Sequence, residues 1–243
     1  MMRDLEKLFS KKNIAIITCY DATFASYLSE RGCDALLVGD SLGILIKGQL
    51  STLEVKMEEV IYHTEAVRRG APFIPIISDM PINSFLNKKM ALKNAKLLIC
   101  AGADIVKIEG DNDILEIVKH LSLNKIPVCG HIGSMPQINK IQSLINADLL
   151  SKAKNLEDAG LKMIVMSMTS STNDKIITSK LTIPTISFRS SEFCNGEVDL
   201  LYDLLGISIG SLTDNKRKDD NMKPSIMLNK LERFIKKIHT RKS

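Results

Sequence analysis

The strongest constraint on the fold is a unit that recurs along the chain, in which a helical segment ends at a glycine and a short apolar segment follows. The unit appears at Gly32, at Gly102 and at Gly160. Glycine commonly ends a helix because it adopts the left-handed backbone conformation without a steric cost. Helices that alternate with short apolar strands indicate parallel strands connected by helices.

Eight strands are expected, and helical segments separate them. The segment Ala35–Val38 is apolar at every position, which is typical of a strand buried on both faces. A (β/α)8 TIM barrel is therefore the leading interpretation, and a doubly wound open sheet is the alternative. The expected strands are residues 13–19, 35–38, 73–78, 105–108, 128–129, 163–166 and 184–188, with a less regular eighth element within 198–205.

Composition sets the class of protein. The chain has 243 residues, of which 44% are hydrophobic, and this suits one large domain with a substantial core. Its five cysteines are scattered and show no paired spacing, so neither a disulfide framework nor a zinc site is indicated. The sequence also lacks the apolar run of a signal peptide or a membrane span. We expect a soluble protein of the reducing cytoplasm.

The charge is concentrated at the end of the chain. Residues 213–243 carry ten Lys or Arg and four Asp or Glu, which leaves 23 bases and 24 acids on residues 1–212. A neutral body argues against a nucleic-acid partner. We expect a barrel domain over residues 1–212, followed over 213–243 by a basic linker and an amphipathic helix. That helix is expected to pack on the barrel or on a neighbouring subunit, with membrane binding as the alternative.

Acidic residues close three of the expected strands. They are Asp40, Asp79 and Glu109, and Lys107 lies on the same side as Glu109 because side chains alternate along a strand. The carboxyl ends of barrel strands lie at one end of the barrel, where active sites form, so the three acids would gather there. The alternatives are that Asp40 only caps a turn and that Lys107 and Glu109 form a structural ion pair.

The chemistry of such a cluster suits a hard cation. Few protein carboxylates with room for water favour Mg²⁺ over Ca²⁺. Such an ion binds a 2-oxo acid through its carboxylate and keto oxygen and promotes formation of an enolate. Lys107 would add a positive charge for the carboxylate of the acid. His131, in a glycine-flanked segment expected to be a loop, either reaches this site or is a hydrogen-bonded loop residue, and His63 is interpreted as structural.

Several long segments resemble the ketopantoate hydroxymethyltransferase family. They are residues 18–25, 36–43, 61–64, 69–72, 106–110 and 126–133, and they follow one another in the order of the family. The resemblance implies a TIM barrel, a homo-oligomer that is commonly a decamer, and a requirement for Mg²⁺. It also implies transfer of a one-carbon unit from 5,10-methylenetetrahydrofolate to 3-methyl-2-oxobutanoate, which gives 2-dehydropantoate in pantothenate biosynthesis.

The same resemblance implies roles for individual residues. Asp40, Asp79 and Glu109 would be associated with the metal, directly or through water. The oxo acid would contact Asp40, Ser41, Asp79 and Lys107.

The second half of the chain departs from the family pattern. Ser167 stands where the family has a glutamate that is taken to be the base for the oxo acid, and residues 187–191 replace a glycine-rich turn. A serine hydroxyl is not a general base near neutral pH unless a neighbour activates it.

Three interpretations of the function follow from this departure. The favoured one is an active, divergent transferase in which water or another residue replaces the base. The second is a non-catalytic or weakly active relative that keeps the metal and oxo-acid half-site, and the third is another enolate reaction on a different 2-oxo acid.

Overall fold

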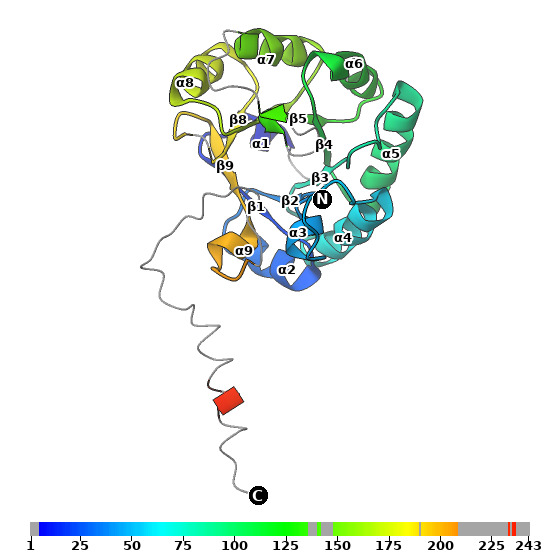
Figure 1. Cartoon of the computed structure of the whole chain (residues 1–243), viewed down its shortest axis with the longest axis vertical. Coiled ribbons are helices and arrows are strands. Elements are labelled where there is room, and N and C mark those ends of the chain that lie inside the picture. The colour runs from blue at the N-terminus through cyan, green and yellow to red at the C-terminus, as the bar shows by residue number, and fades with distance from the viewer. Residues whose placement is uncertain are drawn as a thin grey trace, which may run out of the picture.

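A computed structural model describes residues 5–135, 140–141, 148–189, 191–208, 233 and 235–236. Its eight parallel strands form a closed barrel, because each strand pairs with the next and the last pairs with the first (Figure 1). The expected TIM barrel is thus confirmed. The strands are β1 (Ile14–Thr18), β2 (Ala35–Val38), β3 (Ile76–Asp79), β4 (Ile105–Glu109), β5 (Val128–Met135), β7 (Met163–Ser167), β8 (Thr185–Phe188) and β9 (Gly196–Asp199). The short β6 (Lys140–Ile141) pairs antiparallel with the end of β5.

Helices surround the strands, as Figure 1 shows. Local signals set their ends. Asp21 and Asn87 accept hydrogen bonds from backbone amides at the start of two helices, and Gly102 ends the helix that Asn87 begins, with a φ of 115°. The helices are α1 (Leu5–Ser10), α2 (Ala22–Glu30), α3 (Leu42–Leu45), α4 (Met57–Gly70), α5 (Lys88–Ala101), α6 (Leu115–Leu123), α7 (Asp148–Asp158), α8 (Ser171–Lys180) and α9 (Leu201–Leu204), with a 3-10 turn, η1 (Asn112–Ile114), before α6.

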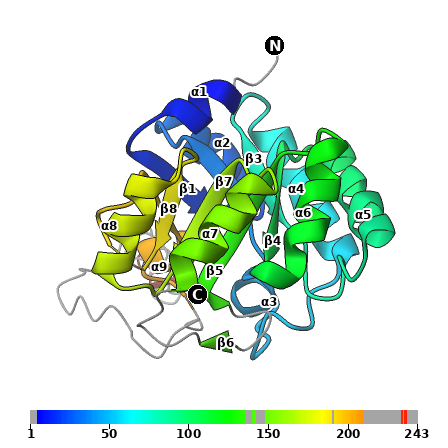
Figure 2. The same ribbon diagram turned by 90° about the horizontal axis from the view of Figure 1, so that it is seen from above.

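Two apolar cores hold the barrel together. One lies between the outer faces of the strands and the helices, and the other fills the barrel interior. Leu8 of α1 belongs to the interior core, so this helix closes the amino-terminal end of the barrel. Figure 2 shows α1 at one end of the strands and α3 with β6 at the opposite end. The carboxyl ends of the strands are thus the end that is left for a site.

The structure corrects the expected limits of three strands. The eighth element was expected as one segment within 198–205, but β9 ends at Asp199 and the chain turns into α9, whose Leu201 amide donates to Thr18 Oγ1. The third strand begins at Ile76 rather than at residue 73, because the preceding prolines have no amide to donate to a neighbour. The fifth strand continues from Val128 to Met135 through its two glycines, which sequence reasoning assigned to a loop.

Parts of the expected organisation stay predictions. The linker and amphipathic helix over 213–243 lie outside the described residues, except for three residues between 233 and 236 that are helical. The division at residue 212 is likewise untested. Within the described ranges, no helix combines the length and the apolar character that a membrane span requires.

Candidate active site

The candidate site is the last inward-facing layer of the barrel at the carboxyl ends of its strands. Ile77, Ile105 and Cys129 belong to the interior core. Because side chains on a strand alternate between its two faces, the residues two positions further along also face inward. On β3, β4 and β5 those residues are Asp79, Lys107 and His131, and Glu109 is the next inward residue on β4. The interior therefore changes from apolar to charged at this end.

These four side chains form a continuous buried array. Lys107 Nζ donates to Asp79 Oδ1 at 2.9 Å and lies 3.8 Å from Glu109 Oε1. Glu109 Oε1 lies 2.6 Å from His131 Nδ1. None of the four residues is more than 5% exposed. Sequence reasoning placed Lys107 beside Glu109, and the structure adds that Asp79 is the closer partner of the ammonium group.

Asp40 and Ser41 follow β2 and join the array through Asp79. The amide of Asp40 donates to Asp79 Oδ2 at 3.0 Å, so both oxygens of that carboxylate accept hydrogen bonds. Gly39 occupies the inward position just before them. A Cβ at Gly39 would lie 2.9 Å from Ser41 Oγ and 3.6 Å from Asp79 Oδ2, which explains why this position suits glycine. The structure therefore brings Asp40, Ser41, Asp79, Lys107 and Glu109 to one end of the barrel.

Tyr20 is a residue of this region that sequence reasoning did not assign to the site. Its hydroxyl lies 2.7 Å from Ser41 Oγ, and its ring stacks on Tyr202 with centroids 6.0 Å apart. The backbone carbonyl of Tyr20 lies 2.6 Å from His63 Nδ1, which agrees with a structural role for that histidine. The only signal in the sequence was the position of Tyr20 just after the first strand, inside the segment 18–25.

Burial and neighbouring charges fix the protonation of two of these groups. Burial disfavours the charge on Lys107, but the carboxylates of Asp79, Glu109 and Asp40 outweigh it and raise the pKa of the ammonium group. Lys107 is therefore a permanent cation at neutral pH. Burial also raises the pKa of Tyr20, so its hydroxyl stays protonated and is able to donate a hydrogen bond.

His131 lies within β5 and not in a loop, which corrects the expectation for its backbone. It stands opposite Glu109 in the register of the barrel. An ionised carboxylate only accepts hydrogen bonds, so His131 Nδ1 donates to Glu109 Oε1, and in a neutral imidazole the lone pair then lies on Nε2. This Nε2 is buried and has no hydrogen-bond partner among the described residues. A buried polar atom without a hydrogen-bond partner costs free energy, so this nitrogen marks a place where a ligand could supply the missing hydrogen bond.

Ser167 ends β7 and is buried, opposite Gly133 and Phe188 in the neighbouring strands. Its hydroxyl is not part of the charged array, and it makes no hydrogen bond with the other described residues. Sequence reasoning placed Ser167 correctly at a strand end. Nothing in the described structure activates this hydroxyl as a base.

The rim beside Ser167 is held by polar side chains in place of a glycine-rich turn. The fully buried Asp174 of α8 accepts hydrogen bonds from Thr169, after β7, and from Ser191 Oγ, after β8, the latter at 2.6 Å. Arg189, also after β8, has a positive φ of 53° and forms an ion pair with Asp203. These contacts tie the two loops together on this side of the site.

The donor set suits a hard cation with few protein ligands. No three carboxylate, imidazole or thiol groups are gathered as a complete metal cage anywhere in the described ranges. Asp40 and Asp79 nevertheless belong to one buried region, because the Asp40 amide donates to Asp79 Oδ2 and both carboxylates act on the charge of Lys107. Carboxylate oxygens are the ligands that Mg²⁺ takes in proteins, usually one or two of them together with substrate oxygens and water. The residues present therefore fit such an ion.

Comparisons with known proteins agree on the family and the fold. A model of the ketopantoate hydroxymethyltransferase family matches residues 1–242. The 3-methyl-2-oxobutanoate hydroxymethyltransferase of Wigglesworthia glossinidia brevipalpis is 45% identical over 216 residues, which are 85% of this chain and 82% of the relative. The enzyme of that name from Nitrosomonas europaea is 44% identical over 211 residues, or 83% and 78% of the two chains.

Among solved structures, 2,3-dimethylmalate lyase of the PEP mutase/isocitrate lyase superfamily has a similar fold. It gives a TM-score of 0.68 at 13% identity over 97% of this chain and 94% of the lyase. This likeness supports the barrel fold alone. The family model over residues 1–242 and the two relatives at 45% and 44% identity show that the chain belongs to the ketopantoate hydroxymethyltransferase family.

Proposed function

We propose that this hydroxymethyltransferase moves a one-carbon unit from 5,10-methylenetetrahydrofolate to 3-methyl-2-oxobutanoate and forms 2-dehydropantoate. The observation that carries the proposal is the buried array of Asp79, Lys107, Glu109 and His131 beside Asp40. It offers a cation for a carboxylate, oxygen ligands for a metal ion and a free imidazole nitrogen for a proton. These groups would bind a 2-oxo acid, polarise its keto group and accept the proton that enolisation releases.

The substrate would lie over the inward-facing layer of the barrel. The Lys107 ammonium group, which is always charged, attracts the carboxylate of the oxo acid. Ser41 donates a hydrogen bond to it, and Tyr20 orients the hydroxyl of Ser41. Asp40 and Asp79 would hold Mg²⁺, with Glu109 associated through water. When it is bound, the ion polarises the keto group and stabilises the enolate.

The residue best placed to accept the proton from C3 is His131. The C3–H bond breaks, its electron pair becomes the enolate double bond between C2 and C3, and the proton moves to Nε2. Glu109 holds the imidazole through Nδ1 and stabilises the imidazolium that forms. This assignment gives the chain a base although Ser167 stands at the strand end where a carboxylate was expected.

The second half of the reaction forms the new carbon–carbon bond. Water adds to the methylene carbon of the folate and both carbon–nitrogen bonds of the bridge break, so that the two hydrogens of water pass to the two folate nitrogens and the carbon is left as a formaldehyde equivalent. The enolate carbon attacks this carbonyl carbon, and the carbonyl oxygen takes up the proton lost from C3 and becomes the new hydroxyl group. Atoms and charges then balance with tetrahydrofolate as the second product.

The first test isolates enolisation from the folate chemistry. Proton NMR of 3-methyl-2-oxobutanoate in D₂O, with protein and Mg²⁺, follows the loss of the C3 proton signal. We expect exchange that depends on Mg²⁺ and that falls by about 10²-fold or more in His131→Gln, the usual contribution of a general base. The matched control is His120→Gln, which makes the same change on α6, outside the site.

The contrary outcomes are distinct. Exchange that persists in His131→Gln would refute His131 as the base while the enolisation itself stands. Absence of exchange in the unmodified chain, with the oxo acid bound, would instead support the non-catalytic relative.

We also propose that the chain forms a homo-oligomer. Several large apolar side chains are more than half exposed, and contact with another copy of the chain would remove apolar surface of this kind from water. Those most exposed are Tyr27, Leu50, Tyr62, Phe73, Leu86 and Leu123. Light scattering on the purified protein gives its mass directly, and a mass of about 27 kDa, that of one chain, would refute the proposal.

A further inference from the structure

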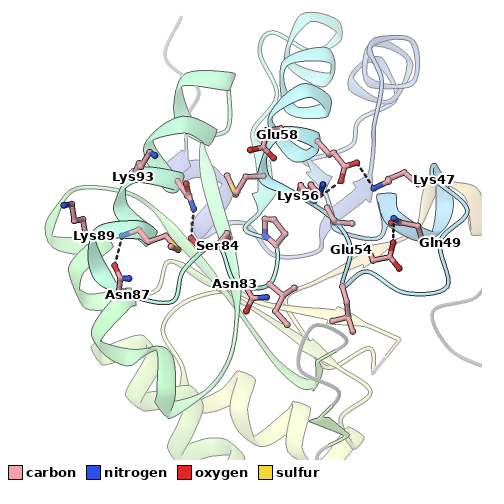
Figure 3. Close-up of a pocket in the computed structure, with 18 residues that line it drawn as sticks. Lys47, Gln49, Glu54, Lys56, Glu58, Asn83, Ser84, Asn87, Lys89 and Lys93 are labelled. Carbon is pink, nitrogen blue, oxygen red and sulfur yellow. Dashed lines mark hydrogen bonds and ion pairs between the residues drawn. The ribbon is translucent and has the colours of Figure 1, made fainter.

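A groove lies outside the charged array, between two loops that leave the site. One loop joins α3 to α4 after Asp40 and Ser41, and the other joins β3 to α5 after Asp79. The groove has a volume of about 950 Å³. On the side of the β3–α5 loop its first lining residue is Pro81, two residues after Asp79. Figure 3 shows Lys47 and Lys56 along one margin, Lys89 and Lys93 along the other, and Ser84 and Asn83 between them.

Two polar atoms in the lining are buried without a partner. Ser84 is 6% exposed, and its Oγ makes no hydrogen bond with the described residues. Gln49 Oε1 is also buried and has no hydrogen-bond partner among the described residues, although Gln49 Nε2 donates to Glu54 at 2.9 Å. A hydroxyl and an amide oxygen left in this way are a donor and an acceptor that a ligand would satisfy.

The charges around the groove favour an anion at its α5 margin. Lys47 is paired with Glu59 at 2.6 Å, but Lys89 and Lys93 form no ion pair in the described part of the chain and lie one helical turn apart on α5. The amino termini of α4 and α5, each 14 residues long, also line the groove. The first turn of a helix attracts negative charge through its free amide groups. Of the lining carboxylates, Glu54 accepts a hydrogen bond from Gln49 and Glu59 pairs with Lys47, whereas Glu58, on the α4 side, forms no ion pair or hydrogen bond with the described residues.

We propose that this groove binds the glutamate tail of the folate co-substrate. The inference rests on the proposed function. In that co-substrate the flat p-aminobenzoyl group separates the reacting methylene group from the glutamate. With the methylene group over Asp40 and Asp79, the tail has to leave over the rim, and the groove is formed by the loops that follow these two residues. The carboxylates of the tail would pair with Lys89 and Lys93, and Ser84 Oγ would donate to an acceptor of the tail.

The test measures binding of p-aminobenzoyl-triglutamate to the full chain by calorimetry, with p-aminobenzoate and inorganic phosphate as reference ligands. We expect the triglutamate to bind at least tenfold more tightly than either reference. The Lys89→Ala/Lys93→Ala variant is expected to weaken triglutamate binding about fivefold, or about 1 kcal/mol, because two exposed ion pairs are lost. A matched control is Lys96→Ala/Lys119→Ala, which removes two exposed lysines that do not line the groove. Ser84→Ala is expected to weaken binding threefold or more.

The outcomes separate this inference from the proposed function. Triglutamate binding that is no tighter than phosphate binding, or that is unchanged in Lys89→Ala/Lys93→Ala, overturns the inference even if C3 exchange of the oxo acid is intact. Specific triglutamate binding without C3 exchange supports the groove and refutes the proposed reaction. In steady state, the double variant is expected to raise KM for the folate triglutamate and leave the C3 exchange rate unchanged. An equal rise in KM for a folate that lacks glutamate would contradict the assignment.

Discussion

Replacement of Asp79 by asparagine tests the buried array directly, because both oxygens of this carboxylate accept hydrogen bonds. Lys107 Nζ donates to Oδ1 at 2.9 Å, and the Asp40 amide donates to Oδ2 at 3.0 Å. Asparagine has the same shape but only one acceptor oxygen. Its NH₂ group must face one of the two donors, so Asp79→Asn removes a charge and also creates a contact between two donors.

The structure sets the size of the effect. Removal of one partner from a buried ion pair typically costs about 3–5 kcal/mol of unfolding free energy, because the other charge stays buried. Glu109 remains 3.8 Å from Lys107 Nζ and continues to compensate the charge, so we expect the lower end, about 3 kcal/mol. For a domain of this size, that loss corresponds to a fall in Tm of roughly 6–12 °C.

The assay is urea unfolding followed by circular dichroism, with thermal unfolding as the second measurement. The control is Glu116→Gln, because Glu116 pairs with Lys88 at the similar distance of 2.7 Å but its side chain is 70% exposed. Loss of this surface pair is expected to cost no more than about 1 kcal/mol. The double variant Asp79→Asn/Lys107→Met should lose less stability than the two single variants added together, since the uncompensated charge is gone. An Asp79→Asn variant as stable as Glu116→Gln would refute the description of a tightly coupled buried pair.

Three further predictions concern other residues of the barrel. Ser167→Glu is expected to raise the rate of C3 exchange about tenfold. This gain is smaller than the 10²–10⁴-fold that a new general base typically contributes, because His131 already accepts the proton. A thousandfold gain in the NMR exchange rate would show that the natural chain lacks a base. Tyr20→Phe removes the hydrogen-bond partner of the Ser41 hydroxyl, and we expect KM for the oxo acid to rise about threefold to tenfold with kcat nearly unchanged. An unaltered KM would show that Tyr20 does not position Ser41 for the substrate. Burial raises the pKa of Cys19 and of Cys129 to about 12, so iodoacetamide at pH 8 should label the exposed Cys100 and spare both of these thiols, as mass spectrometry would reveal. The same shifts predict that stability falls as the pH rises above about 8.5, because these thiols ionise in the unfolded chain while they stay protonated in the folded one.

Sequence reasoning was most successful where one local signal dominates. Gly102 was expected to end a helix, and it ends Lys88–Ala101, whose start is capped by the neighbouring Asn87. The strand Ala35–Val38 was equally clear, since it is apolar at every position between Asp34 and Gly39. The placement of Asp40, Asp79 and Glu109 at strand ends followed from the same pattern.

It failed where tertiary contacts outweigh local preference. Gly130 and Gly133 interrupt the apolar pattern and suggest a loop, yet β5 continues through both of them, because Gly130 is paired with β4 and β7 and Gly133 is paired with Ser167 of β7. A Cβ at Gly130 would lie 2.5 Å from Leu161 Cδ1, so this glycine makes room for a neighbour that is distant in sequence. No local rule shows that a glycine serves a packing contact of this kind.

By itself, the sequence determined which residue types close the strands and that the strands are parallel, because strand periodicity and the order of elements are properties of the chain. It could not determine which of those residues touch. Only the closed barrel places Asp79 between Lys107 and the Asp40 amide, sets Glu109 against His131 Nδ1 and leaves Nε2 buried without a partner among the described residues. The physical reason is that hydrogen bonds and buried charges depend on distances of a few ångströms between strands, and barrel closure sets those distances.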